Sequence, residues 1–208
     1  INDTQQTAIS FTGKKQLIYK GKINEGVYFN RNPIFEAELK HLLERGSNDF
    51  NDHDVMYREL NNRYKLIQLL KDIEPYPGYP GTDLGNNMAR ISSIIEKNKP
   101  YNVFHIVQGG FDTHLGQIQR LNSLYKDLSS CLKKFANHLN NMGEWDNTQI
   151  LIYSEFGRSI TENSNLGTDH GTAGPVFVLG GQQIYGSLAN LNPIYETYKI
   201  AGNDILKY

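Results

Sequence analysis

The run Val103-Phe104-His105-Ile106-Val107 is followed closely by Gly109-Gly110-Phe111-Asp112-Thr113-His114. The first run is short, apolar and rich in β-branched and aromatic residues, which is typical of a buried strand. The second begins with two glycines, which let the backbone turn sharply, and then presents a carboxylate and an imidazole. We therefore expect a strand that ends in side chains able to do chemistry.

Two more polar clusters lie at the edges of apolar runs. Ser154-Glu155-Phe156-Gly157-Arg158 follows Ile150-Leu151-Ile152-Tyr153, and Gly167-Thr168-Asp169-His170-Gly171 precedes Val176-Phe177-Val178-Leu179. If these strands share one parallel sheet, their loops converge on the edge where α/β folds place their sites. Two carboxylates and two imidazoles would then meet, which is a donor set suited to a divalent metal.

Helical and strand patterns alternate along the chain. Apolar residues at helical spacing predict helices over 33–46, 52–72, 82–97 and 115–142. Strand patterns lie over 8–19, which forms either a hairpin or edge strands, and at 103–107, 148–153 and 175–179. The Gly/Asn/Ser/Thr-rich segment between the last two strands is predicted to be a loop. The alternation predicts an α/β fold with a parallel sheet covered by helices.

Composition narrows the class of protein. A net charge of −1 over 208 residues argues against nucleic acid as the main partner. No stretch approaches the ~20 apolar residues of a transmembrane helix. The lone Cys131 excludes an internal disulfide framework. We expect one α/β domain over 1–208, with its motif-bearing core at 76–190 and its weakest pattern at 1–75. Both ends resemble interior points of a longer protein, so we expect a fragment that lacks an N-terminal part.

The first cluster permits two interpretations. Asp112 and His114 are two residues apart in an extended turn and can point the same way, toward a metal. Alternatively, Asp112 caps the following helix and His114 is solvated in its first turn, and Thr113 is also a candidate cap.

The other clusters supply the remaining candidates. Glu155 is a metal ligand, a partner for Arg158 or a solvated carboxylate. Arg158 is a clamp for an anionic substrate, since its planar fork suits phosphate or sulfate oxygens, or it pairs with Glu155 or Glu162. His170 has little hydrophobic reason to be ordered in its polar segment, which favours a metal ligand, and Asp169 could orient its ring.

The three clusters together, with this spacing, resemble the bacterial family known as domain of unknown function 1501. The resemblance extends from about Tyr79 to Gly186 and covers only the C-terminal part of the family's pattern. That family is assigned to the alkaline phosphatase and sulfatase superfamily. The resemblance implies a three-layer α/β/α fold with a mostly parallel central sheet, and a parent protein that is periplasmic or otherwise exported.

The resemblance also implies site roles. Asp112, His114 and His170 would form one metal site, and Glu155 would belong to a second, with zinc, calcium, magnesium or manganese as the ion. Phe156 stands where the superfamily has a metal-binding histidine, which puts the second metal in doubt. The superfamily's nucleophile comes from an early strand, and no residue here matches it, so the nucleophile stays unknown.

Two functions follow from these expectations. The first is a metal-dependent hydrolase of phosphate or sulfate esters, acting on an anionic small molecule or a glycan ester. The second is a non-catalytic binding or cell-surface protein on the same fold, with an eroded metal site. Whether the chain is an enzyme is left open.

Overall fold

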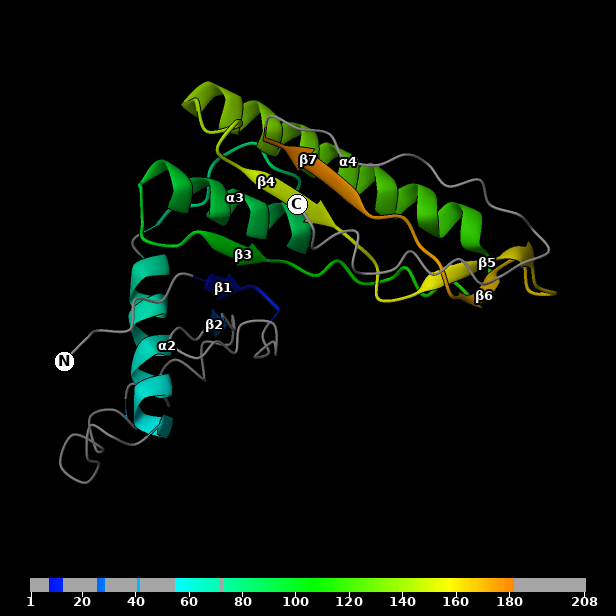
Figure 1. Ribbon diagram of the computed structural model, residues 1–208, viewed down its shortest axis with the longest axis horizontal. Coiled ribbons are helices and arrows are strands. Elements are labelled where there is room, and N and C mark those ends of the chain that lie inside the picture. The colour runs from blue at the N-terminus through cyan, green and yellow to red at the C-terminus, as the bar shows by residue number, and fades with distance from the viewer. Residues whose placement is uncertain (1–7, 13–25, 29–40, 42–54, 72, 182–208) are drawn as a thin grey trace. The chain divides into compact units, whose positions relative to one another are not determined.

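The computed structural model describes residues 8–12, 26–28, 41, 55–71 and 73–181 as helices, short strands and connecting segments (Figure 1). The chain is mixed α/β and divides into two compact units, Ile1–Gln108 and Gly109–Tyr208, which are described separately. The single domain expected over 1–208 stays a prediction. The helix expected over 33–46 lies outside the described residues except for His41, which is helical.

The first unit contains a small parallel sheet. Strand β1 (Ala8–Ser10) lies between β2 (Val27–Tyr28) and β3 (Val103–His105). Ile9 at its centre is fully buried. The second strand of the expected hairpin lies outside the described residues, and β1 takes both of its observed neighbours from farther along the chain. Both pairings of β1 are parallel, whereas the sequence predicted a hairpin or edge strands in this region.

Helices α2 (Val55–Lys71) and α3 (Asp83–Glu96) form at two of the predicted positions. Helix α3 begins at Thr82, whose hydroxyl accepts a hydrogen bond from the Gly85 backbone N–H at 3.1 Å. This bond satisfies one of the N–H groups that the first helical turn leaves without a partner. Helix α3 buries its apolar face, which comprises Leu84, Met88, Ile91 and Ile94.

The second unit is built around the long helix α4 (Gln117–Met142), which ends at Gly143 in the left-handed conformation with φ of 74°. Its C-terminal half buries Phe135 and Leu139, as the apolar spacing predicts. Its first turn differs, because Ile118 is 70% exposed. No helix among the described residues has both the length and the apolar character of a membrane span.

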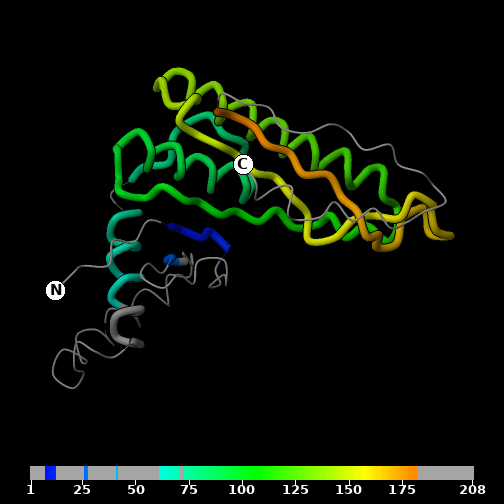
Figure 2. Tube along the Cα trace, viewed as in Figure 1, coloured from blue at the N-terminus to red at the C-terminus, as the bar shows by residue number. Residues whose placement is uncertain are grey.

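Strands β4 (Gln149–Ile152) and β7 (Phe177–Gly180) run side by side in Figure 2 and pair antiparallel, so the parallel order expected for this pair is wrong. A parallel pair needs a crossover connection, usually a helix. Here the connection instead forms a hairpin of β5 (Gly157–Glu162) and β6 (Thr168–Gly171), where the sequence predicted a loop. The described strands form three separate small sheets.

Replacing Thr82 with alanine should lower the free energy of unfolding by about 1 kcal/mol, because the N-cap acceptor is lost. Thr82→Ser keeps the hydroxyl and should stay within about 0.5 kcal/mol of the parent. Urea denaturation followed by circular dichroism measures both variants. Equal stability of the alanine and serine variants would contradict the capping role.

Candidate metal centre

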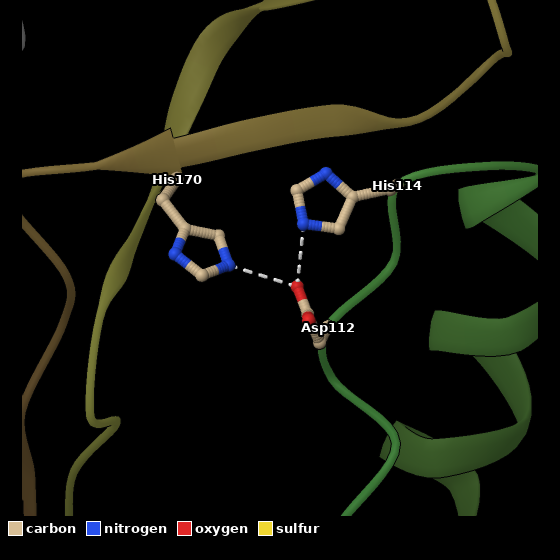
Figure 3. Close-up of side chains that lie close together, drawn as sticks. All are labelled: Asp112, His114 and His170. Atoms are coloured by element: carbon tan, nitrogen blue, oxygen red, sulfur yellow. Dashed lines mark hydrogen bonds and ion pairs between the residues drawn. The ribbon is translucent and has the colours of Figure 1, made fainter.

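Three side chains from two distant segments meet at one point in the second unit. Asp112 and His114 lie in the segment that precedes α4, and His170 projects from β6 toward them (Figure 3). Their ligand atoms lie within 4.8 Å of one another, and all three side chains are exposed to solvent. The structure thus brings together three of the four residues that the sequence singles out as metal ligands.

The β5–β6 hairpin determines which residues face this point. Arg158 pairs with His170 directly across the antiparallel strands, and the pairing becomes irregular between Arg158 and Glu162. Residues directly opposite each other project to the same face of a sheet. A Cβ on Gly171 would lie 2.6 Å from the carbonyl carbon of Arg158, so the strands approach too closely there for a side chain.

One carboxylate oxygen accepts contacts from three side chains. Asp112 Oδ1 lies 2.8 Å from His114 Nε2, 2.9 Å from His170 Nε2 and 3.2 Å from Arg158 Nη1. An Nε2–H on either ring would donate to this oxygen, and a ring whose Nε2 is unprotonated could instead offer its lone pair to a cation. The same atoms therefore suit either a hydrogen-bonded cluster or a cation site.

The surroundings of Asp112 favour its charged form. The hydrogen bond from His170 lowers the pKa of the carboxyl group below its ordinary value, opposed by desolvation. The positive charges that His114, His170 and Arg158 can carry lower this pKa further. Asp112 is therefore a carboxylate at neutral pH, which is the form that binds a metal ion.

A second carboxylate lies beside the His114 ring. Asp169 Oδ1 is 3.4 Å from His114 Nδ1, and the same oxygen lies 3.4 Å from the side-chain amide nitrogen of Asn163. Asn163 also donates to the backbone carbonyl of His114 at 3.1 Å. An Nδ1–H that donates to a carboxylate leaves Nε2 as the ligand atom. Asp169 thus contacts His114, whereas the sequence suggested it as a partner of His170.

Phe156 lies flat against the ring of His170. The two ring centroids are 3.9 Å apart with an interplanar angle of 10°, and the centroid of the His114 ring lies 5.1 Å from that of the His170 ring. The carbon at the centre of the Arg158 guanidinium lies 5.5 Å from the Phe156 centroid. Phe156 therefore packs against a candidate ligand at the position where the superfamily resemblance led us to look for a second-metal histidine.

Glu155 stands apart from this group. Its side chain is exposed, and within the part of the chain that the structure describes it makes no hydrogen bond or ion pair. Among the residues that the structure describes, the group of ligand atoms comprises Asp112, His114 and His170. The ion pair of Arg158 is with Asp112, at 3.2 Å, and involves neither of the glutamates considered from the sequence.

The turn of the β5–β6 hairpin accepts hydrogen bonds from the start of helix α4. The backbone N–H groups of Gly116 and Gln117 donate to the carbonyls of Asn165 and Leu166 at 3.1 and 2.9 Å. Gly116 has φ of 54° and provides no side-chain cap. The prediction that Thr113 caps this helix is wrong, because backbone carbonyls of the hairpin turn accept the hydrogen bonds of the N–H groups at the start of α4.

Gly167 lets the hairpin turn approach the backbone of His114 closely. A Cβ there would lie 2.2 Å from the carbonyl carbon of His114.

Sequence reasoning missed the residues that connect these segments. Gln117 Oε1 lies 3.1 Å from Thr113 Oγ1 and 2.6 Å from Thr168 Oγ1. Asn163 accepts two backbone N–H bonds of the hairpin turn, from Asn165 at 3.0 Å and Gly167 at 3.1 Å. The available signal was the spacing of Thr168 and His170, which places both on one side of a strand.

Comparison with known proteins places these residues inside one family segment. Residues 94–190 match the family described as "Protein of unknown function (DUF1501)", which supports the family suggested by the three clusters. The matched segment contains every residue of the candidate metal centre. Neither the curated proteins nor the solved structures include a match to the chain.

Replacing Gly167 with alanine should lower the free energy of unfolding by about 1–3 kcal/mol, because the new methyl group collides with the backbone of His114. Gly109→Ala is the matched control, since a Cβ there has no neighbouring atom within 4 Å. Urea denaturation of both variants measures the difference. Equal stability of the two variants would show that the hairpin can move away from His114 without cost.

Proposed function

We propose that Asp112, His114 and His170 bind a divalent metal ion, and that the protein is a metal-dependent hydrolase of phosphate or sulfate esters. The observation that carries the proposal is the meeting of three ligand atoms within 4.8 Å, although His170 is 58 residues from Asp112. Exposed acidic side chains are common on protein surfaces. Two imidazoles from separate segments aimed at the same carboxylate oxygen are a more specific arrangement.

The donor types favour zinc over calcium and magnesium among the four ions considered. Zinc takes nitrogen and oxygen ligands, and catalytic zinc sites use three protein ligands with a further position open to water or substrate. Calcium and magnesium prefer sites made of oxygen atoms, and magnesium keeps several waters. A set of two imidazoles and one carboxylate therefore fits zinc better than calcium or magnesium.

The residues present fit such an ion. Asp112 is held as a carboxylate, and an Nδ1–H of His114 donated to Asp169 would leave Nε2 facing the cluster. When bound, a divalent ion supplies positive charge that polarises an ester oxygen. The cluster is exposed, so a charged ester can reach it from solvent.

Arg158 supplies fixed positive charge beside the cluster. Its side chain is 20% exposed, and two of its nitrogens donate to Asp112 and to Thr113, at 3.2 and 3.0 Å. Its Nε atom is buried and has no hydrogen-bond partner among the described residues. Under the proposal, the guanidinium stabilises negative charge on the phosphoryl or sulfuryl group while holding Asp112 in place.

The remaining parts of the proposal rest on the superfamily resemblance. It supports a three-layer α/β/α fold and a nucleophile from an early strand, for which we have matched no residue of this sequence. The substrate would be an anionic small molecule or a glycan ester, and the setting periplasmic or exported. A net charge of −1 gives no support to nucleic acid as a partner.

Elemental analysis of bound metal tests the site. After incubation with Zn²⁺ and removal of free metal, the parent chain should hold about one ion, and the double variant Asp112→Ala/His170→Ala should hold almost none, because two of three ligands are gone.

The matched control is His41→Ala/Asp146→Ala, which removes the same residue types from exposed positions outside the cluster. It should retain the parent's metal content. Equal metal content in the parent and in the Asp112→Ala/His170→Ala variant would remove the site.

A second candidate function is a non-catalytic binding or cell-surface protein with an eroded metal site. It is favoured by Phe156, which stacks on His170 where a second-metal ligand was sought, and by the position of Glu155 outside the cluster.

Hydrolysis assays separate the two candidates. The chain, and any longer protein of which it forms part, would be supplied with Zn²⁺ and tested on aryl phosphates and aryl sulfates. The hydrolase proposal expects turnover that disappears in Asp112→Ala/His170→Ala. Metal binding without turnover by the longer protein would favour the non-catalytic candidate.

A further inference from the structure

We propose that Gln117 is a positioning residue for the Asp112–His114–His170 cluster: its side-chain oxygen joins the segment that carries Asp112 and His114 to the strand that carries His170. This inference rests on the proposed metal site, and it adds a residue that contacts no metal ligand directly through its side chain.

In the structure, the guanidinium and hydroxyl groups of this network donate their hydrogen bonds to oxygen acceptors. An arginine can only donate, so Thr113 Oγ1 accepts the 3.0 Å bond from Arg158 Nη2. The single proton of Thr113 then goes to Gln117 Oε1 at 3.1 Å, in preference to the Phe111 carbonyl at 3.5 Å. Thr168 lies 2.6 Å from the same Gln117 oxygen and donates to it. The side-chain oxygen of Gln117 therefore accepts two hydrogen bonds, one from each threonine hydroxyl.

The two threonines are neighbours of the proposed ligands. Thr113 separates Asp112 from His114 in the chain, and Thr168 is two residues before His170 on β6. The backbone N–H of Thr168 also donates to the Thr113 carbonyl, at 3.3 Å. A displacement of either threonine would therefore move at least one ligand relative to the others.

The two threonines of the network are buried, whereas the three proposed ligands are exposed. Thr113 is fully buried and Thr168 is 8% exposed, whereas Asp112, His114 and His170 are all exposed. Exposed side chains gain little from mutual contacts in water and do not hold one another firmly. A buried hydroxyl that loses its acceptor carries the full desolvation cost, so the buried network resists displacement. We infer that Gln117 sets the distance between the two halves of the site.

The test uses substitutions that separate the acceptor oxygen from side-chain bulk. Gln117→Met keeps the length of the side chain and removes the acceptor, whereas Gln117→Glu keeps acceptor oxygens at the same place. Gln119→Met is the matched control, since Gln119 is exposed on the same helix and two residues away. All variants are made in the whole 208-residue chain.

Two measurements are made on each variant. The first records the imidazole ¹⁵N–¹H signals of His114 and His170 in the metal-free protein by NMR, assigned through single His→Gln substitutions. The second is the dissociation constant for Zn²⁺ alone. Loss of a residue that orients metal ligands costs about 10–100-fold in metal affinity. Gln117→Met should displace both ring signals and weaken Zn²⁺ binding by that factor, Gln117→Glu should not weaken Zn²⁺ binding because it keeps the acceptor oxygens, and Gln119→Met should match the parent.

The ring signals keep this inference separate from the proposed function. If the parent binds no Zn²⁺, the proposed function fails, and ring signals displaced in Gln117→Met but not in Gln119→Met still support positioning. Undisplaced ring signals in Gln117→Met overturn positioning whatever the metal result. Displaced signals with parent-like Zn²⁺ affinity overturn it as well.

A second pair of variants covers the case in which Gln117→Met does not fold. Thr168→Val removes the hydroxyl with little change of shape, and Thr168→Ser retains it. The inference expects displaced ring signals and weaker Zn²⁺ binding for the valine variant, with rescue by serine. Equal behaviour of these two variants overturns the inference.

Discussion

The candidate site depends on one oxygen atom, Asp112 Oδ1, which takes contacts from two imidazoles and one guanidinium. Donors that crowd around a single acceptor repel one another when charged, so such a point persists only where the backbone holds the donors in place. Here the backbone does so through close approaches that exclude side chains, at Gly167 against His114 and at Gly171 against Arg158. The chemistry of the site is thus a consequence of where two backbone segments touch.

Much of the local structure could be predicted from the sequence, because local physics decides it. Helices α3 and α4 carry apolar residues at helical spacing, and Gly143 ends α4 in the left-handed conformation that glycine tolerates. The β5–β6 hairpin could not be predicted in this way. Its strands read GRSITE and TDHG, with few apolar residues and no clean alternation. Tertiary contacts, including the hydrogen bonds between the hairpin turn and the start of α4, specify those strands instead.

The residues of the candidate site also include some that could be predicted from the sequence and some that could not. Asp112, His114 and His170 could be chosen from residue type and from their place beside apolar runs, and the structure gathers them. The stacking of Phe156 and the bonds of Gln117 could not be inferred, since each depends on how closely the hairpin approaches α4. Thr113 illustrates the limit. Its sequence position suits a helix cap, but its hydroxyl instead contacts Arg158 and Gln117, because the hairpin turn already occupies the helix end.

The separation of the two halves along the chain has a consequence for biosynthesis. Asp112 and His170 are 58 residues apart, and the intervening segment contains all of α4 and β4. Bringing distant segments together closes a large loop, which costs chain entropy and slows the step relative to local helix formation. Helix α4 can therefore form soon after it emerges from the ribosome. Asp112, however, can contact His170 only after the β5–β6 hairpin has been translated. Any cation captured earlier would be held by an unfinished set of ligands.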